Sequence, residues 1–527
     1  MVRLIFLLST FFVLLANWLL SSIFPSIWWS LVILGPLIVL GFMDMLQSSH
    51  TIRRNFPVIG NLRYFMESIR PEINQYFVES NTSGMPFNRL DRSLVYQRAK
   101  GELDTMPFGT QKNVYEVGYE WVTHSLMPRH VDPAHLRVII GSACARPYSA
   151  SIFNIGAMSF GSLSANAVMA LNQGAGMGGF AQNTGEGGLT KYHLSGGGDV
   201  IWQIGTGYFG CRSMDGKFSP QNFAEKAKLP QVKMIEIKLS QGAKPGHGGI
   251  LPAAKLTKEI AEIRGVPMGK SVISPPGHSA FSTPVEFLYF VQTLRDLSGG
   301  KPVGFKLCVG KTREFVSLVK AMRKTGITPD FITVDGGEGG TGAAPLEFSN
   351  YIGYPLNDGL IFVRNTLIGF SLRDKIKLIS SGKINSGFGI LKHMVMGSDL
   401  CYSSRGMMLA LGCIQALTCN TNQCPTGVAT QDPSLAVGLV VAEKNKRVAN
   451  FHKATVKSFA EILGAMGLDR PSQLKPWHLL RRVSLDKVKN YTEIYPFIKD
   501  GELLQEPVPA EFARACQFSS PDSFDIA

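Results

Sequence analysis

Three cysteines lie close together in the second half of the chain, and their spacing has the most definite chemistry. Five residues separate Cys413 from Cys419, four separate Cys419 from Cys424, and Pro425 follows. Thiolates are the usual ligands of iron–sulfur clusters, and closely spaced cysteines followed by proline are typical of cluster-binding loops. Three ligands favour a three-iron four-sulfur (3Fe-4S) cluster, or a four-iron cluster with one open corner. Zinc or free thiols are the alternatives, although zinc normally takes a fourth Cys or His, and no His lies between Cys401 and Cys424.

Composition excludes several other classes of protein. Eight cysteines among 527 residues are too sparse for a disulfide scaffold, and a hydrophobic content of 45% excludes a disordered chain. The formal net charge is +14, but no basic run is interleaved with aromatic residues, so we expect no nucleic-acid partner. Proximity to anionic lipid explains the basic charge equally well.

The central part of the chain alternates short apolar runs with amphipathic stretches of helical length. We predict strands at residues 152–158, 234–239, 271–274, 303–308, 331–334, 377–379 and 400–402. Strand, loop and helix repeated about eight times over some 260 residues is typical of a (β/α)8 TIM barrel. In this fold the loops after the strands build the active site, and those after the seventh and eighth strands hold a phosphate group.

Two glycine-rich segments match nucleotide-binding motifs only formally. Residues 174–179 fit the dinucleotide fingerprint, but they follow a predicted helix at 164–173 instead of a strand. Residues 265–271 are one residue short of a P-loop and run into a predicted strand. Neither segment predicts nucleotide binding.

The N-terminal part contains an uncharged stretch from residue 4 to residue 43, about twice the roughly 20 residues that one helix needs to cross a bilayer. Pro25 falls near the middle, with Trp18, Trp28 and Trp29 around it as interfacial anchors. We predict a hairpin of two transmembrane helices, at about 4–23 and 27–43. A cleaved signal peptide is the alternative, but the stretch is too long and no cleavage pattern follows it.

The charges around this hairpin predict its orientation. Arg3, Arg53, Arg54 and Arg63 lie outside the two helices, whereas the turn between them carries no charge. Because cytoplasmic segments are enriched in Lys and Arg, we expect both ends, and the catalytic part, in the cytoplasm. We divide the chain into the hairpin at 1–45, an irregular cap at 46–149, the barrel with its cysteine loop at 150–433, and a helical extension with a tail at 434–527.

Several motifs, in the same order along the chain, resemble the synthase domain of glutamate synthases. They are AMSFGS at 157–162, NTGEGG at 183–188, QGAKPG at 241–246, ISPP at 273–276, DGGEGGTGAAP at 335–345, and the cysteine segment from LGC at 411–413 to CPTGVATQ at 424–431. The resemblance covers about residues 140–433 and includes both cysteine spacings. It implies a stand-alone, membrane-anchored form of this FMN-binding family.

In that family the barrel binds FMN, receives electrons through an iron–sulfur cluster, and converts 2-oxoglutarate and ammonia to glutamate through 2-iminoglutarate. The resemblance implies that Cys413, Cys419 and Cys424 ligate the cluster. It implies that Lys306 faces the N1 and O2 edge of the flavin, where a fixed cation stabilises the reduced anionic form. The alternative is a lysine that only extends from a barrel strand toward solvent.

The resemblance also implies the residues that hold the substrate. Gln241 and Lys244 would lie beside flavin and substrate, and Arg264 would bind a carboxylate of 2-oxoglutarate. Glu186, inside a glycine-rich loop, would transfer protons or guide ammonia, so that Glu186, Lys244 and Lys306 are the predicted catalytic residues. A solvated helix-face Arg264 and a loop Glu186 paired to a nearby base are the alternatives.

The remaining predicted FMN contacts are mostly backbone groups. They belong to Ala157, Met158, Gly337, Gly340, Gly382, Asn385, Ser386, Gly387, Arg405 and Gly406. The resemblance places the FMN phosphate at the N–H groups of the loops that begin at Gly382 and Arg405, with the Arg405 side chain as counter-charge. Glycine lets the backbone approach the phosphate closely, although some of these glycines could simply form turns.

The chain departs from the family pattern in ways that affect its partners. The glutaminase domain with its N-terminal cysteine, the C-terminal β-helix and a credible NADPH fingerprint are missing from the sequence. We therefore expect free ammonia as substrate and an external electron donor, namely a ferredoxin-like protein, a reductase subunit or a membrane donor. His247 and Ile250 replace the usual Glu and Gln of the family, and that Gln belongs to its substrate shell.

Three functions fit the sequence. The leading interpretation is synthesis of glutamate from 2-oxoglutarate and ammonia. A second keeps the cofactors but acts on a different keto, imino or hydroxy acid at the membrane. The third is a non-catalytic electron-transfer subunit, against which Glu186, Lys244, Arg264 and Lys306 argue, because an electron relay needs no site for a substrate carboxylate.

Overall fold

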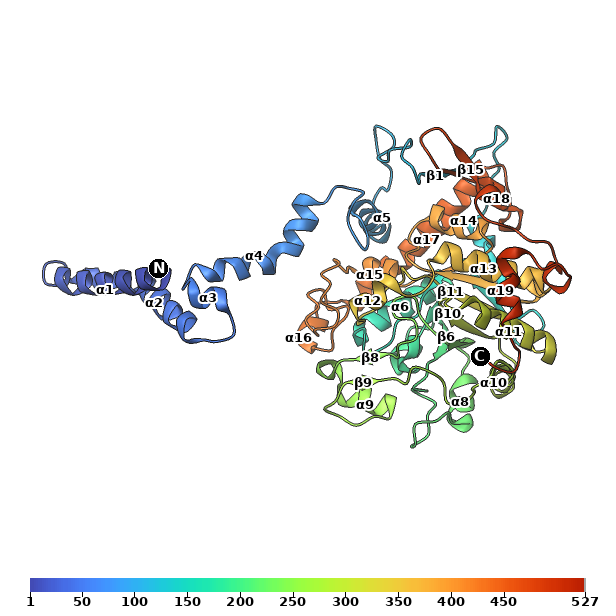
Figure 1. Cartoon of the computed structure of the whole chain (residues 1–527), viewed down its shortest axis with the longest axis horizontal. Helices are drawn as coiled ribbons and strands as arrows, with labels where there is room; N and C mark the ends of the chain where they lie inside the picture. The colour runs from blue at the N-terminus through green and yellow to red at the C-terminus, as the bar shows by residue number, and fades with distance from the viewer. Residues whose placement is uncertain (526–527) are drawn as a thin grey trace. The chain divides into compact units, whose positions relative to one another are not determined.

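The computed structural model of the protein describes residues 1–525. The chain forms two compact units, Met1–Arg89 and Leu90–Ala527. Both are drawn in Figure 1.

The first unit is helical. Its elements are α1 (Val2–Ser21), η1 (Pro25–Trp29), α2 (Ser30–Leu46), α3 (Thr51–Asn55), α4 (Gly60–Ile73) and η2 (Asn74–Val78). The segments Val2–Ser21 and Pro25–Leu46 are each long and apolar enough to cross a membrane. The predicted pair of N-terminal apolar helices is thus confirmed, with Pro25 at the start of the turn between them.

Helices α1 and α2 pack against each other through one small residue and one polar contact. Gly41 lies directly against the ring of Phe6, where any Cβ atom would collide. Ser30 Oγ donates a hydrogen bond to Asn17 Oδ1 at 2.6 Å, and Asn17 Nδ2 donates to the Val13 carbonyl at 2.9 Å. The two apolar helices therefore meet with their buried polar atoms satisfied, as a low-dielectric environment requires.

The second unit is built on a closed barrel of eight parallel strands, which confirms the predicted TIM barrel. The strands are β4 (Phe153–Ile155), β5 (Ala181–Asn183), β6 (Asp199–Ile204), β7 (Val232–Lys238), β10 (Val303–Leu307), β11 (Phe331–Asp335), β12 (Lys377–Ser381) and β13 (Leu400–Ser403). All residues of β10 and β11 are buried. Parallel strands covered on both faces read as continuous apolar runs, which is why these two are plain in the sequence.

Two barrel strands differ from the sequence prediction. β5 and β6 were not among the predicted strands, because their inward positions carry Asn183 and Gln203 and so break the apolar runs. The strand predicted at 271–274 is not part of the barrel. There β9 (Val272–Ile273) pairs antiparallel with β8 (Ile250–Leu251), and its Ile273 side chain is 67% exposed.

Helices surround the barrel and complete the strand–helix repeat (Figure 1). They are α6 (Ala165–Gly178), α7 (Lys191–Leu194), α8 (Pro220–Ala227), α9 (Lys258–Arg264), α10 (Pro284–Leu297), α11 (Thr312–Thr325), α12 (Leu346–Tyr351), α13 (Leu356–Gly369), α14 (Gly387–Val395) and α15 (Arg405–Leu411). Local sequence signals start them, as at α10, where Thr283 and Glu286 form a capping box around Pro284.

Inside the barrel, polarity rises from one end to the other. The floor, at the N-terminal ends of the strands, is apolar and consists of Ala181, Ile201, Met234, Phe331, Ile379 and Leu400. A hairpin of β2 (Arg137–Ile140) and β3 (Tyr148–Ser151) closes it from below, with Ile140, Tyr148 and Ala150 in the same cluster. A middle layer follows, in which the fully buried Glu236 accepts hydrogen bonds from Asn183, Gln203 and Thr333.

The cap and the C-terminal extension meet on the barrel's outside. β1 (Glu120–Val122) forms a three-stranded sheet with β14 (Leu479–Arg482) and β15 (Val488–Asn490). The extension also contains α16 (Pro433–Ala436), α17 (Val441–Ala465), α18 (Tyr491–Ile494) and α19 (Ala510–Gln517), and the cap contains α5 (Arg89–Lys100). The predicted helical extension is confirmed. Its end is not a loose surface tail, because Phe512 of α19 is buried and α19 packs on α11.

Candidate active site at the barrel mouth

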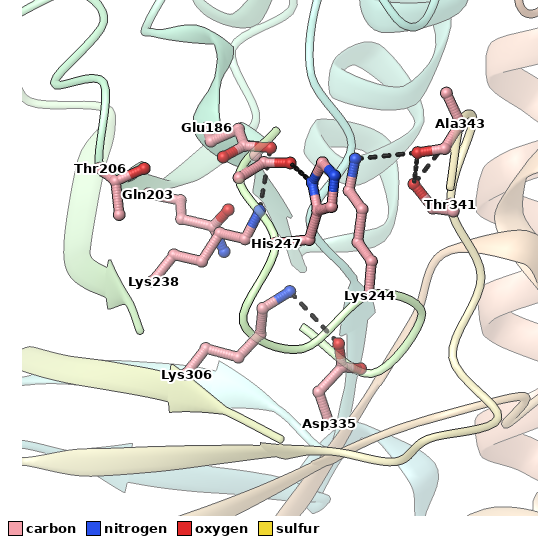
Figure 2. A network of polar contacts seen from close by, with 12 residues as sticks. Glu186, Gln203, Thr206, Lys238, Lys244, His247, Lys306, Asp335, Thr341 and Ala343 are labelled. Atoms are coloured by element: carbon pink, nitrogen blue, oxygen red, sulfur yellow. Dashed lines mark hydrogen bonds and ion pairs between the residues drawn. The ribbon is translucent and has the colours of Figure 1, made fainter. Parts of the chain in front are cut away.

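A buried carboxylate lies at the C-terminal end of the barrel. Glu186 follows β5 in the short helix η4 (Gly185–Gly187), and its Oε1 lies 2.9 Å from Nζ of Lys238, the last residue of β7 (Figure 2). Gly185 has φ +62°, and a Cβ atom there would lie 2.7 Å from the Ser159 backbone nitrogen. The NTGEGG loop therefore needs glycine to carry Glu186 this close to its neighbours.

Three cations determine the charge of Glu186. Burial by itself would raise the pKa of the carboxyl group, but Lys238, Lys244 and Arg264 outweigh burial and lower that pKa below its usual value. Burial lowers the pKa of Lys238 and lowers that of Lys244 to about 8. The Glu186 carboxyl group is therefore ionised near neutral pH, with Lys238 as its closest basic neighbour.

A second charged pair lies beside the first (Figure 2). Lys306 Nζ, on the fifth strand of the barrel, is 3.7 Å from Asp335 Oδ2 at the end of β11. The same carboxylate oxygen accepts a hydrogen bond from the Gly242 backbone N–H at 2.9 Å. Asp335 thus connects Lys306 to the loop that follows β7.

This loop, residues 240–249, lies across the barrel mouth. Gly242 touches the Gly336 carbonyl so closely that no Cβ atom would fit, and Gly249 touches the Glu186 carboxylate in the same way. Lys244 Nζ donates to the Ala343 carbonyl at 2.8 Å. Gln241 begins the loop and is half-buried. The loop therefore joins the DGGEGGTGAAP segment on one side to Glu186 on the other.

Arg264 lies at the edge of the mouth, at the end of α9. Its Nη2 donates to the Phe160 carbonyl at 3.1 Å, and its guanidinium lies 5.0 Å from the ring centre of Phe209. The side chain is buried, and its Nε has no hydrogen-bond partner among the described residues. A buried guanidinium with unused donors is suited to a carboxylate ligand. It is not the solvated helix-face arginine considered as an alternative.

Two cavities flank this region. The cavity between Glu186, Lys238 and residues 246–249 is about 10 Å³, room for about one water molecule. A larger cavity of about 340 Å³ is lined by Gly207, Arg212, Lys270 and Pro275. The Thr206 hydroxyl, which donates to the Pro275 carbonyl at 2.6 Å, lies between the two.

The predicted phosphate loop follows β12. Gly382, Asn385 and Ser386 lead into α14, where Ser386 caps the helix by accepting from the Gly389 N–H at 3.0 Å. The free N–H groups of a helix N-terminus are suited to a phosphate. Gly387 has a packing reason of its own, because a Cβ atom would lie 2.5 Å from the Phe459 nitrogen on α17.

The other predicted FMN residues divide between two places. Ala157 and Met158 follow β4, and Gly337 and Gly340 follow β11, all at the mouth end of the barrel. Gly406 follows β13 and would collide with Ser403 if it carried a Cβ atom. The side chain of Arg405 bonds the Thr341 carbonyl and lies 3.8 Å from Cys419 Sγ. It therefore touches the cysteine loop, and the phosphate role predicted for it remains a prediction.

The three cysteines lie in one loop after α15. Burial, together with the neighbouring Cys419 and Cys424, raises the pKa of the Cys413 thiol. The loop is fixed by the Tyr96 hydroxyl, which donates to the Cys413 carbonyl at 2.7 Å, and by Gln431, which donates to the Leu163 carbonyl at 2.7 Å. Within residues 1–525, no three His, Cys, Asp or Glu side chains are arranged to hold a metal ion.

Sequence reasoning missed several residues of the mouth. Lys238 and Asp335 are the ion-pair partners described above, and Glu236 is the buried acceptor below Lys238. His278 Nε2 donates to the Lys238 carbonyl at 2.9 Å, and burial lowers the pKa of His278 to about 4, so the ring is neutral. One signal was available: β7 reads VKMIEIK, in which the inward positions Glu236 and Lys238 are charged within an otherwise apolar barrel strand.

Comparison with known proteins gives a consistent result. Residues 129–469 match the family model described as a conserved region in glutamate synthase. The chain is 38% identical over 481 residues to the glutamate synthase large subunit-like protein YerD of Bacillus subtilis (strain 168), covering 83% of this chain and 91% of that protein. It is 33% identical over 320 residues to the archaeal-type glutamate synthase [NADPH] of Thermotoga neapolitana, covering 60% of each. It is 33% identical over 265 residues to the ferredoxin-dependent glutamate synthase of Antithamnion sp., covering 50% of this chain and 17% of that protein.

Proposed function

The chain belongs to the glutamate synthase family of FMN-dependent oxidoreductases, and we propose that it makes glutamate from 2-oxoglutarate and ammonia through 2-iminoglutarate. The observation that carries this proposal is the Glu186 carboxylate, paired with Lys238 and influenced by Lys244 and Arg264. An electron relay needs no such group, whereas a dicarboxylic acid and ammonia need fixed cations and a base.

The charges give each residue a task. Arg264 and Lys244 hold the carboxylates of 2-oxoglutarate, since among residues 1–525 Arg264 Nε is buried without a hydrogen-bond partner, and Lys244 Nζ donates to the Ala343 carbonyl at the mouth. The ionised Glu186 accepts a proton from ammonium, and the ammonia released attacks the keto carbon. One proton of the added nitrogen moves to the keto oxygen, Glu186 returns its own proton to the resulting hydroxyl, which leaves as water, and the protonated imine remains.

FMN would supply the electron pair that reduces the imine carbon. The residues at the mouth fit this group: Lys306 provides a cation at the end of the fifth strand, and the loop from Gly382 to Ser386 presents the N-terminus of α14 to a phosphate.

We further propose that Cys413, Cys419 and Cys424 hold an iron–sulfur cluster, most simply 3Fe-4S. The donor chemistry fits, because three thiols share one loop and the Gln415 N–H lies 3.5 Å from Cys413 Sγ. Cys419→Ser should lose iron and labile sulfide and the cluster's electron paramagnetic resonance signal, whereas Cys401→Ser, inside the barrel wall, should keep them. Zinc in place of iron, or full iron content in Cys419→Ser, would overturn this assignment.

The membrane and the electron donor complete the proposal. The two apolar helices α1 and α2 anchor the protein with both ends in the cytoplasm, as the distribution of arginines supports. Electrons then come from a ferredoxin-like protein, a reductase subunit or a membrane donor. The relatives support an external donor by name, since one is designated NADPH-dependent and another ferredoxin-dependent.

The decisive experiment follows the flavin. The purified protein, reduced anaerobically, is mixed with 2-oxoglutarate and ammonium, and both flavin absorbance and glutamate are measured. We expect reoxidation and glutamate formation only when both substrates are present. Glu186→Gln should bind 2-oxoglutarate but form glutamate at least about 10²-fold more slowly, because the proton acceptor is gone. Reoxidation by the acid alone would contradict the proposal.

A second candidate substrate is favoured by two specific differences from the family pattern. Ile250 replaces the Gln that the family usually has in its substrate shell, and it lies in β8, paired with Ile273. His247, in place of the usual Glu, packs edge-on against Phe348 at 5.4 Å. These apolar contacts favour a keto or hydroxy acid with a less polar side chain. A panel of such acids in the same flavin assay distinguishes the two, because the true substrate gives the highest kcat/KM.

A further inference from the structure

The helix α4 of the first unit carries an apolar stripe that no described residue of that unit covers. The stripe begins at Ile59 just before α4, includes Leu62, Phe65, Met66, Ile69 and Ile73, and continues with Tyr76 and Phe77 in η2; each member has another member three or four residues away. All are exposed except Ile69, which is half-buried, with values from 37% for Ile73 to 85% for Phe77. Large aromatic and aliphatic side chains in one stripe mark an interaction surface.

The other face of the helix is polar and is already occupied. Tyr64 lies opposite the stripe, and its ring meets His50 at 4.9 Å and the guanidinium of Arg53 at 4.4 Å. Helix α3 thus packs on the back of α4 and leaves the stripe open. Arg63 and Arg70 flank the stripe, and four arginines face two glutamates between residues 50 and 78.

The start of α4 is tied to the end of α2. Asp44, in the last turn of α2, accepts hydrogen bonds from the Val58 N–H at 2.9 Å and from Asn61 Nδ2 at 2.6 Å. The Asp44 side chain is buried by these contacts. If α2 ends at the surface of a bilayer, this clamp makes α4 begin at the same surface.

We propose that α4 lies in the interface of an anionic lipid bilayer, with its apolar stripe in the acyl boundary and its arginines at the headgroups. The stripe, the flanking positive charges and the clamp to α2 are the features of an interfacial amphipathic helix. Arginines beside such a stripe bury their stems along the lipid and keep the charge at the surface. The inference rests on the proposed membrane anchoring of α1 and α2 and adds a second, in-plane membrane contact.

The test is a depth measurement on the full chain in vesicles of phosphatidylcholine and phosphatidylglycerol. A genetically encoded nitroxide amino acid, which leaves the native cysteines untouched, is placed singly at Phe65, at Ile69, and at Ser68 on the polar face. Electron paramagnetic resonance then compares relaxation by oxygen, which concentrates in lipid, with relaxation by a water-soluble nickel complex. We expect the oxygen-to-nickel ratio at Phe65 and Ile69 to exceed that at Ser68 several-fold.

Two results would overturn the proposal. Equal nickel access at Phe65 and Ser68 would place the stripe in water. Protection of Phe65 from both reagents would mean that protein covers the stripe, either the barrel unit or a second copy of the chain. A label at Leu14 in α1 separates this proposal from the membrane anchoring itself. If oxygen relaxes the label at Leu14 and nickel relaxes the label at Phe65, the anchoring stands and only the proposal for α4 is wrong.

Discussion

The floor and the mouth of the barrel are built by the same eight strands, yet their chemistry is opposite. Along β7 the inward side chains are Met234, then Glu236, then Lys238, so one strand passes from an apolar to two ionisable side chains within five residues. The floor packs hydrocarbon, which stabilises the fold. The mouth buries charges, whose desolvation costs stability unless each has a partner. The floor therefore contributes mainly to the stability of the fold, and the mouth contributes mainly to its reactivity.

The largest effect on activity is expected from Lys238→Met, which replaces a charged side chain of the mouth by an apolar one like those of the floor. Methionine keeps the length of the side chain but leaves Glu186 buried without its closest cation, so the pKa of Glu186 should rise. We expect kcat to fall about 10²- to 10³-fold, because Glu186 then accepts protons poorly at neutral pH. Steady-state glutamate formation at saturating substrates measures this effect.

Two further variants give this prediction its controls. Lys233→Met alters the same strand, but Lys233 is 37% exposed and pairs with Asp199 at 3.5 Å on the outside, so activity should stay near that of the native protein. Lys238→Met breaks the buried Glu186–Lys238 pair and should therefore also lower the free energy of unfolding by about 3–5 kcal/mol. The double change Glu186→Gln with Lys238→Met should regain stability without regaining activity. If the double variant is as unstable as Lys238→Met, the unpaired Glu186 charge does not explain the loss of stability.

A substitution in the floor should have the opposite pattern of effects, with a large loss of stability and little loss of activity. Phe331→Ala removes a fully buried ring from the apolar cluster and should cost about 3–5 kcal/mol of unfolding free energy, with kcat per folded molecule little changed. Chemical denaturation followed by circular dichroism measures the loss. Tyr289→Ala, where the ring is 57% exposed on α10, should cost far less. If Phe331→Ala lowers kcat as strongly as Lys238→Met does, the two ends of the barrel are not independent.

A smaller effect is expected from Lys306→Met, which tests the cofactor side of the mouth. Loss of one charged contact is worth about 1.5–3 kcal/mol, so FMN should bind roughly 10- to 100-fold more weakly. Titration of the flavin-free protein with FMN gives the dissociation constants. Lys311→Met removes only a surface charge, 69% exposed beside Glu314, and should leave FMN affinity unchanged. If Lys306→Met binds FMN with native affinity, the flavin does not bind beside the fifth strand.

The sequence predicted the parts of the barrel in which local pattern and tertiary environment agree. The strands β10 and β11 are apolar because they are buried on both faces, and the cysteine loop is visible because its spacing lies within one segment. β5 and β6 were missed because Asn183 and Gln203 point inward toward Glu236, a partner about 30 to 50 residues away. The sheet of β1, β14 and β15 was missed for the same reason, since Trp121 pairs with Leu480 far along the chain.

Residues of the candidate site were predictable where they belong to a segment that resembles the family. Glu186, Lys244, Arg264 and Lys306 came from the resemblance to a family. Their ion-pair partners did not: Lys238 shows in the sequence only as a charged inward position of β7, and Asp335 only as the first residue of the DGGEGGTGAAP motif. Burial and charge pairing arise only when the strands close into a barrel, so the sequence alone does not show which charges meet.

The smallest expected effect is a pH dependence that belongs to the mouth alone. Burial lowers the pKa of Lys244 to about 8, from 10.5 in the unfolded chain. Below pH 8 the buried, charged Lys244 therefore reduces stability, and between pH 8 and 10.5 the folded state loses its proton first, so this penalty is relieved as pH rises. Binding of the substrate carboxylate has the opposite trend, because it needs the charge. At saturating ammonium, KM for 2-oxoglutarate should rise up to about tenfold for each pH unit above 8. In Lys244→Arg this rise should disappear, because guanidinium keeps its proton throughout the range. An unchanged pH profile in that variant would show that Lys244 does not hold the substrate's carboxylate.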